Sequence, residues 1–302
     1  MLVPAVGVAR TSTMVADLST GKVLVAEDVD TVRYPASLTK LMTLYLLFDA
    51  VEQGRVTLDQ KLPVSPLAAR QPATRLGLRT GGRIAVEECI RALILRSAND
   101  VAMVVAEGLE GSESRFAEKM TATARRMGMS RTVFRNPSGL PDPEHVTTAR
   151  DMLILAEALI VRFPQYYSYF GIRTCRVAGK TLATHNSFMA RYDGADGLKT
   201  GYTHDAGYNL AASVERDGHR LVGVVLGDSG RYARDNTMAR IMDAGFEQLG
   251  TPRPARQHIV LAKAGPGRHH RIVRARARRH HVLRRARWNR AARVTHRRAR
   301  AS

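Results

Sequence analysis

A serine and a lysine stand one helical turn apart near the start of the chain, at Ser37 and Lys40. Residues at i and i+3 lie on one face of a helix with Cβ atoms about 5–6 Å apart, so the lysine amine can reach the serine hydroxyl. A serine hydroxyl is a poor nucleophile until a base takes its proton, and Lys40 is the base that this spacing brings near. Lys40 must then be neutral part of the time. Lowering its pKa from about 10.4 to near 7 costs about 4–5 kcal/mol, which burial and a second cation can supply. The pair therefore predicts nucleophilic catalysis.

Two further polar motifs follow, Ser97-Ala98-Asn99 and Lys199-Thr200-Gly201. The first begins 60 residues after Ser37, and the second begins 102 residues after Ser97. A Ser-x-x-Lys pair alone is more often an ordinary helix surface than a site. In this order, however, the three motifs form the set found in serine β-lactamases and penicillin-binding proteins.

Each residue of these two motifs suits a step of acyl transfer. Lys199 is the expected second cation for the catalytic pair, and its charge also attracts a substrate carboxylate. Ser97 can relay a proton to a leaving amine, and Asn99 can orient the base or a substrate amide. Thr200 offers a hydroxyl to the carboxylate, while Gly201 lets a strand backbone approach the ligand closely. We therefore expect the substrate to bind as an added strand.

Four segments carry a resemblance to one family: residues 34–43, 96–100, 134–141 and 196–202. Together they resemble the D-alanyl-D-alanine carboxypeptidases among the low-molecular-mass penicillin-binding proteins, over about Ser12 to Gly250. The resemblance implies a serine peptidase that removes the terminal D-alanine from peptidoglycan stem peptides through an acyl-enzyme on Ser37. It also implies covalent inhibition by β-lactams and a periplasmic or extracytoplasmic location.

The same resemblance assigns further parts of the site. It implies an oxyanion hole made by the backbone N–H groups of Ser37 and Tyr202. It also implies a carboxylate-binding arginine near the start of the last helix, for which Arg234 is the first candidate and Arg231 the competitor. A solvated arginine at the end of a helix is the alternative at this place.

The histidines and cysteines indicate packing more than chemistry. His145, His185 and His204 lack a spacing that would chelate a metal or complete a Ser-His-Asp triad, so we expect no metal and no cofactor. Cys89 and Cys175 form no metal spacing and no disulfide framework, and we expect both to pack as small apolar residues.

The elements that position these motifs can be read from periodicity, caps and turn residues. We expect a β-hairpin over residues 13–27, an extended lobe or loop over 55–82, and later strands over 173–177, 207–215 and 220–226. We expect helices over 37–54, 86–96, 100–108, 113–127, 148–162 and 234–249, with Asn99 or Asp100 capping the third and Thr147 or Thr148 the fifth. This order predicts an α+β fold of the β-lactamase/transpeptidase type, with an antiparallel sheet built from both chain ends and a mostly helical insert.

The net charge of +20 is unevenly divided along the 302 residues. Residues 251–302 hold 16 Arg, one Lys and no acid, which makes +17; the other 30 of the 47 basic residues face 27 acids in residues 1–250, which makes +3. We therefore expect a catalytic domain over residues 12–250 and a disordered cationic tail over residues 251–302. The largely apolar residues 1–11 fit either the remnant of a signal peptide or an irregular terminus.

Two other functions stay open. A serine β-lactamase of the best-known class needs a glutamate that activates water for deacylation. Glu144 lies in the corresponding loop, but the Glu-x-x-Leu-Asn pattern is missing, so we expect a penicilloyl ester to leave slowly. The second alternative is a polyanion-binding protein that acts through the tail. The tail has a single aromatic residue, Trp288, which disfavours nucleic acid as the partner and leaves an anionic membrane surface.

Overall fold

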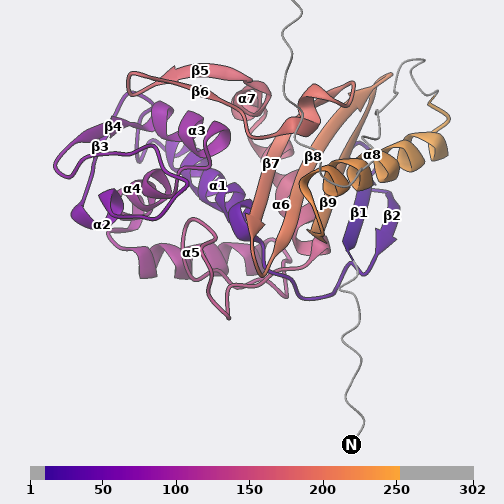
Figure 1. Cartoon of the computed structure of the whole chain (residues 1–302), viewed down its shortest axis with the longest axis horizontal. Coiled ribbons are helices and arrows are strands. Elements are labelled where there is room, and N and C mark those ends of the chain that lie inside the picture. The colour runs from indigo at the N-terminus through magenta and orange to yellow at the C-terminus, as the bar shows by residue number, and fades with distance from the viewer. Residues whose placement is uncertain (1–10, 252–302) are drawn as a thin grey trace, which may run out of the picture. The chain divides into compact units, whose positions relative to one another are not determined.

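An antiparallel sheet runs through the middle of the structure, a computed structural model that describes residues 11–251 (Figure 1). Its strands are β1 (Ser12–Asp17), β2 (Val23–Glu27), β7 (Ala195–Thr203), β8 (Gly207–Arg216) and β9 (His219–Asp228). They lie in the order β2-β1-β9-β8-β7, so both ends of the described chain build one sheet and β7 forms an edge. The expected α+β class is confirmed. The expected signal-peptide remnant (1–11) and disordered tail (251–302) lie outside the described residues, apart from residues 11 and 251.

Helices cover both faces of the sheet and make up most of the insert between its strands. Their bounds are α1 Thr39–Glu52, α2 Pro66–Ala69, α3 Val86–Leu95, α4 Asn99–Glu110, α5 Glu113–Arg126, α6 Ala149–Arg162, α7 Pro164–Tyr167 and α8 Arg231–Gln248. Figure 1 shows α8 lying across the front of the sheet and α6 behind it. α1 packs against α6 and also against α3, α4 and α5, so it joins the sheet to the helical insert.

The strand β1 shows why the sheet is buried on both faces. Val15 packs in one apolar cluster with Met238 and Phe246 of α8, whereas Met14 and Ala16 pack in the second cluster with residues of α1 and α6. Successive side chains of a strand point to opposite faces, so an apolar run fills both layers. Each large side chain buried in these layers stabilises the fold by about 1.5–3 kcal/mol.

Several local predictions match the structure. The expected hairpin is the β1–β2 pair, and α6 begins directly after Thr148. The Thr148 Oγ1 accepts a hydrogen bond from the Asp151 N–H at 3.1 Å, as a capping threonine should. The first helix differs slightly, because the 3₁₀ turn η1 (Ala36–Leu38) holds Ser37 and α1 starts at Thr39.

The lobe before α3 and the segment before β7 contain more strand than the sequence predicts. Residues 55–82 include β3 (Lys61–Pro63), which pairs with β4 (Arg83–Ala85). The predicted strand near residue 175 is β5 (Thr174–Val177), but it lies outside the main sheet and pairs with β6 (Lys180–Ala183). Their two-residue turn has positive φ at Ala178 and Gly179, 45° and 77°. Because alanine rarely adopts that conformation, the sequence gives little signal for this hairpin.

Candidate active site

The Lys40 amine lies between three oxygen atoms at the buried start of α1. It is 3.1 Å from the Ser37 Oγ, 2.8 Å from the Asn99 Oδ1 and 2.6 Å from the Ser138 carbonyl oxygen. A neutral amine has two N–H donors and one lone pair. The amide and carbonyl oxygens can only accept, so they take the two donors, and the lone pair is left facing the Ser37 hydroxyl. This arrangement suits a base that removes the serine proton.

The surroundings of Lys40 favour its neutral form. The side chain has no exposed surface. Burial lowers the pKa of Lys40 well below its usual range, the nearby Lys199 charge lowers it further, and Asp100 opposes both effects. The pKa of Lys40 is therefore shifted in the direction that a catalytic base requires.

The turn that leads into α4 brings Ser97 and Asn99, the first residue of α4, to the same place. Ser97 has a left-handed backbone with φ 58°, and its Oγ is buried without a hydrogen-bond partner among the described residues. The Asn99 amide donates to the Pro72 carbonyl at 3.0 Å while its oxygen accepts from Lys40. The prediction that Asn99 or Asp100 caps this helix is wrong: the N-cap is Ala98. The amide of Asn99 is already engaged with Lys40, and the Asp100 carboxylate accepts from the backbone N–H groups of residues 76–78.

The edge strand β7 forms the opposite wall. Lys199 is buried and its Nζ donates to the Thr200 carbonyl at 2.8 Å. Burial, and after it the charge of Arg234, lower the pKa of Lys199 to about 7. A Cβ atom on Gly201 would lie 3.0 Å from the Pro35 carbonyl oxygen and 3.2 Å from the Ser37 nitrogen. Glycine at this position therefore allows β7 to lie directly against the turn that carries Ser37.

A cavity of about 490 Å³ opens between these walls. The predicted residues that line it are Ser37, Ser97, Asn99, Lys199, Thr200, Gly201, Tyr202 and Arg234, and Lys40 lies buried beneath it. Further lining residues include Thr74, Ser138, His185, Tyr208 and Arg231, and among the described residues no Asp or Glu lines the cavity. The cavity is therefore cationic and suits an anionic ligand.

Both candidate arginines line this cavity, but they differ in burial and in hydrogen-bond partners. Arg234 is buried, and its Nε and Nη2 donate to the Asp235 Oδ1 at 3.0 and 2.6 Å. Arg231 is exposed, and its Nη2 donates to the His185 carbonyl at 3.4 Å. Burial, followed by the charge of Lys199, lowers the pKa of His185 to about 4. His185 is therefore neutral at pH 7 and adds no charge to this end of the cavity.

The loop over residues 136–140 completes the site, although the sequence reasoning assigned it no role in catalysis. Asn136 holds the loop because its Oδ1 accepts from the Ser138, Gly139 and Leu140 N–H groups at 2.8–3.2 Å. Gly139 has φ 81°, and a Cβ there would lie 1.8 Å from the Ala36 carbonyl oxygen. The Asn-Pro-Ser-Gly run signals a loop, but no local pattern indicates its contact with Lys40, 98 residues away.

His145 supports the turn that carries Ser37 through hydrogen bonds. Its Nδ1 accepts from the Arg135 N–H at 3.2 Å, so its Nε2 carries the proton and donates to the Thr39 Oγ1 at 2.8 Å. It is a buried histidine with both ring nitrogens engaged, as expected. The described residues contain no group of three or more His, Cys, Asp or Glu side chains arranged to hold a metal ion.

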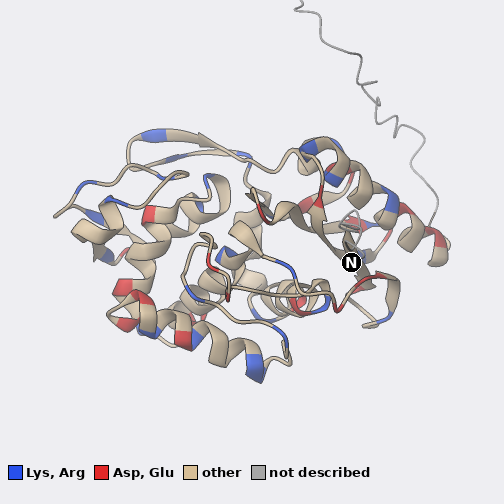
Figure 2. Ribbon diagram, turned by 60° about the horizontal axis from the view of Figure 1, so that its bottom comes forward, with Lys and Arg blue, Asp and Glu red and all other residues tan. Residues whose placement is uncertain are grey.

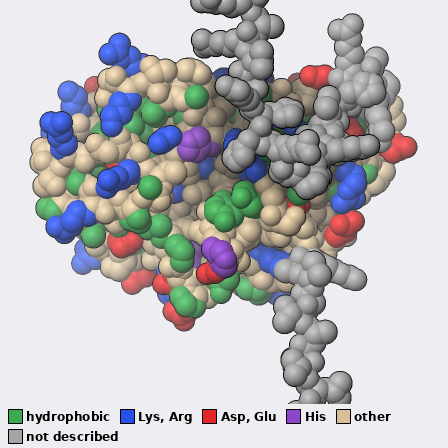
Figure 3. All heavy atoms as spheres, viewed as in Figure 1, with side chains coloured by type: hydrophobic (Ala, Val, Ile, Leu, Met, Phe, Trp, Pro, Cys, Tyr) green, Lys and Arg blue, Asp and Glu red, His purple; other side chains and the backbone are tan. Residues whose placement is uncertain are grey.

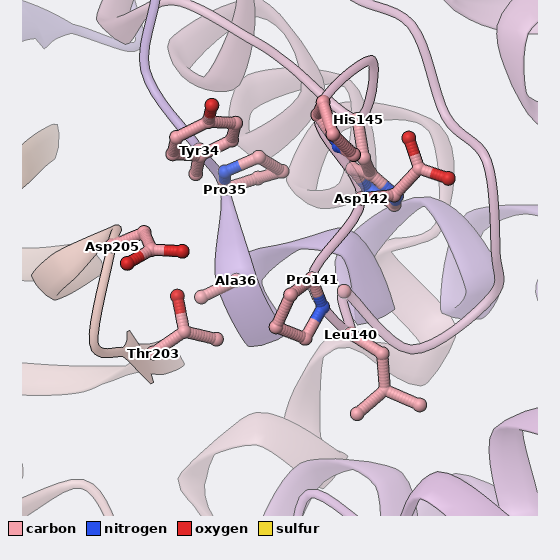
Figure 4. Close-up of a pocket in the computed structure, with 11 residues that line it drawn as sticks. Tyr34, Pro35, Ala36, Leu140, Pro141, Asp142, His145, Thr203 and Asp205 are labelled. Atoms are coloured by element: carbon pink, nitrogen blue, oxygen red, sulfur yellow. The ribbon is translucent and has the colours of Figure 1, made fainter.

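A second, smaller pocket of about 200 Å³ adjoins the cavity and shares Gly139, Leu140 and Thr203 with it. Figure 4 shows Thr203 and Asp205 on one wall and Leu140 and Pro141 on the opposite wall. Tyr34 also lines the pocket. The pocket thus extends the cavity beyond the end of β7.

Comparison with known proteins agrees with this geometry. The family model described as D-alanyl-D-alanine carboxypeptidase matches residues 3–230. The chain is 32% identical over 257 residues to the D-alanyl-D-alanine carboxypeptidase DacF of Bacillus subtilis, which covers 83% of this chain. The chain spans 66% of the length of that relative.

Two solved structures have the same arrangement of sheet and insert. Penicillin binding protein 5 from Haemophilus influenzae superposes with a TM-score of 0.75 at 29% identity, covering 78% of this chain and 70% of that one. Penicillin-Binding Protein D2 from Listeria monocytogenes, solved in its ampicillin-bound form, gives 0.72 at 31% identity, covering 78% and 96%. The expected transpeptidase-like fold is therefore confirmed, and the chain belongs to the D-alanyl-D-alanine carboxypeptidase family.

Proposed function

We propose that this protein is a serine-type D-alanyl-D-alanine carboxypeptidase that removes the terminal D-alanine from peptidoglycan stem peptides. The observation that carries the proposal is the buried Lys40 amine, held 3.1 Å from the Ser37 Oγ by two oxygens that can only accept. A positioned general base of this kind accelerates proton transfer about 10²–10⁴-fold. Family membership supports the same activity.

Acylation then follows from the positions of the groups. Lys40 takes the Ser37 proton while the Oγ attacks the carbonyl carbon of the penultimate residue. The backbone N–H groups of Ser37 and Tyr202 stabilise the oxyanion. Ser97 relays the proton from Lys40 to the nitrogen of the departing D-alanine as the C–N bond breaks, which leaves an ester on Ser37. The buried Ser97 Oγ has no hydrogen-bond partner among residues 11–251, so its donor and acceptor capacity remains free for this relay.

The substrate carboxylate fixes the direction of the peptide. Lys199 and Thr200, with Arg234 behind them, hold the terminal carboxylate, while the scissile carbonyl lies at Tyr202. The residues before the scissile bond therefore run along β7 past Thr203, toward the smaller pocket that Asp205 lines. An extended peptide can pair there with the free edge of the sheet.

Deacylation needs a base for the attacking water, and we assign this second role to Lys40. Within the part of the chain that the structure describes, no carboxylate lines the cavity. Glu144, the residue considered for a β-lactamase, has a 73% exposed side chain and pairs with Arg135 at 3.1 Å. We therefore propose that penicillin acylates Ser37 and leaves slowly, so nitrocefin should not be turned over rapidly. The ampicillin-bound form of the Listeria monocytogenes protein supports the binding of a β-lactam at this site.

The location and the tail extend this proposal. We propose that the enzyme acts outside the cytoplasm, where its substrate is. Among the described residues, no helix is both long and apolar enough to cross a bilayer. We further propose that the 17 cationic side chains of residues 251–302 bind an anionic membrane surface electrostatically.

The direct test is release of D-alanine from diacetyl-lysyl-D-alanyl-D-alanine. The wild type should release D-alanine, and Ser37→Ala and Lys40→Ala should not. Ser114→Ala, an exposed serine on α5, should behave as the wild type. If the wild type releases no D-alanine, the proposed function is wrong.

A further inference from the structure

One lobe of the molecule carries an excess of positive charge beside the catalytic cavity. Residues 61–96 and 173–185 hold ten Lys and Arg against two Glu, so they carry +8, and the rest of residues 1–250 carries −5. Nine of the ten cations are exposed. Figure 3 shows Lys and Arg side chains gathered over this side of the molecule, where Figure 1 labels β3 to β6.

The nine exposed cations are not neutralised by the two glutamates of this lobe. Glu87 pairs with Arg91, the tenth cation, and Glu88 accepts from the Ala85 and Ala178 N–H groups. Among the described residues, none of the nine exposed cations forms an ion pair with a carboxylate. Figure 2 shows the acidic positions spread over other parts of the ribbon. The unpaired charge is available to a ligand.

Part of this charge lines a groove that opens into the catalytic cavity. The groove has a volume of about 820 Å³, and its charged lining residues are Arg75, Arg96 and Lys180. We call these three residues and the space between them the basic groove. It shares Thr74 and His185 with the cavity. A ligand in the basic groove therefore lies next to the substrate.

The junction is at the end of the cavity that holds the leaving D-alanine. His185 is close enough to Lys199 for the charge of Lys199 to lower its pKa, and Arg96 Nη1 lies 3.4 Å from the His185 Nε2. In the proposed binding mode, the rest of the substrate stem leaves in the other direction, past Thr203. The basic groove is therefore beyond the reach of the peptide being cleaved.

We propose that the basic groove binds the carboxylates of a neighbouring stem peptide in the same peptidoglycan polymer. This inference rests on the proposed function, which makes the substrate part of a polymer with many peptide carboxylates. Arginine forms paired, charge-assisted hydrogen bonds with carboxylates, and an exposed cationic groove raises the local concentration of an anionic partner. A short peptide substrate cannot occupy both the cavity and the groove, so only the polymer gains from it.

The test compares two matched double variants of the full chain. Arg75→Gln/Lys180→Gln removes one arginine and one lysine from the basic groove, and Arg115→Gln/Lys119→Gln removes the same two types from the exposed face of α5. Binding to insoluble peptidoglycan is measured by co-sedimentation in a Ser37→Ala background, so that no turnover occurs. Release of D-alanine from the short peptide and from the polymer is measured with Ser37 intact.

We expect the groove variant to bind the polymer about fivefold more weakly, as for the loss of two partly exposed ion pairs. The groove variant should release D-alanine from the short peptide as the wild type does. The α5 variant should match the wild type in polymer binding and in D-alanine release. Salt at 1 M should remove the difference, because it shortens the Debye length to about 3 Å. Amidation of the polymer carboxylates should make the wild type and the groove variant bind alike.

Equal polymer binding by the wild type and the groove variant at low salt would overturn the proposal. So would a difference that persists after amidation, because the ligand would then be a phosphate or another anion. Loss of binding to phosphatidylglycerol vesicles without loss of polymer binding would assign the groove to lipid instead. Failure of the wild type to release D-alanine would contradict the proposed function. Co-sedimentation would still decide whether the groove binds the polymer.

Discussion

At the scale of single residues, the candidate site contains two lysines whose pKa values are lowered. Lys40 and Lys199 are both buried, and burial is the largest cause that lowers each pKa. The two lysines have opposite tasks in the proposed mechanism. Lys40 must be neutral to accept a proton, whereas Lys199 must be charged to attract a carboxylate.

Lys40→Arg separates charge from basicity. Arginine keeps a positive charge at this position, but its pKa above 12 prevents it from accepting the Ser37 proton. We expect acylation by a fluorescent penicillin to slow by about 10²–10⁴-fold. Stopped-flow labelling gives this rate. An arginine variant that acylates within a few fold of the wild type would show that Lys40 is not the base.

The lowered pKa of Lys199 predicts that substrate binding weakens at alkaline pH. Its pKa of about 7 in the free protein means that it is charged below this pH and loses its charge as the pH rises through it. We therefore expect kcat/KM for the short peptide to fall above pH 7, because this ratio reports the free enzyme. Lys199→Arg should stay charged and lose this alkaline decline. An unchanged pH profile in that variant would contradict the assignment.

At the scale of elements, three segments far apart in sequence hold the turn that carries Ser37. These are the loop over residues 136–140, the edge strand β7 and β8. In β8, the Asn209 Nδ2 donates to the Tyr34 and Pro35 carbonyls at 2.9 and 3.0 Å. The loop and β7 approach the turn through backbone atoms, and β8 approaches it through the Asn209 side chain. Glycines and backbone carbonyl groups therefore matter as much as the candidate catalytic side chains.

Gly139→Ala tests how closely the loop must approach. The added Cβ would lie 1.8 Å from the Ala36 carbonyl oxygen, so the loop or the Ser37 turn must move. Gly128→Ala is the matched control, because Gly128 also has a positive φ but has open space around it. Both variants should lose about 1–2 kcal/mol of stability from the left-handed backbone. Only Gly139→Ala should also lose most of its acylation rate; equal rates in the two folded variants would argue against this role.

The sequence predicted elements better than the contacts between them. Local periodicity and caps located the first hairpin and the start of α6 after Thr148, because both signals lie within a few residues. The predicted cap of α4 was wrong because the Asn99 side chain forms hydrogen bonds with Lys40 and with the Pro72 carbonyl instead. The hairpin β5–β6 was missed because its turn uses Ala178. The Ser138 carbonyl that holds Lys40 has no local signal, since it is 98 residues away.

At the scale of the whole molecule, charge is segregated more strongly than composition suggests. The 17 charges of residues 251–302, the +8 of the basic lobe and the −5 of the rest of residues 1–250 add to the net +20. Segregation of this kind steers binding to anionic surfaces and leaves the fold itself unaffected. Both proposed anionic partners, the membrane surface and the neighbouring stem peptide, depend on this segregated charge.

Deleting residues 252–302 tests the proposed role of the tail. We expect D-alanine release from the short peptide to be retained, because every predicted site residue lies within residues 37–234. Binding to phosphatidylglycerol vesicles should be lost, and in the full chain it should weaken as salt rises. Vesicle binding that persists after the deletion would show that the tail is not what binds the membrane surface.

The most direct test of the central claim is to locate the covalent intermediate by mass spectrometry after brief exposure to penicillin. We expect one adduct of the mass of penicillin, on the peptide that contains Ser37, and no adduct in Ser37→Ala. We also expect Lys40→Arg to accumulate the adduct far more slowly. An adduct on another residue, or D-alanine release by Ser37→Ala at the wild-type rate, would contradict the claim that Ser37 and Lys40 form the nucleophile and its base.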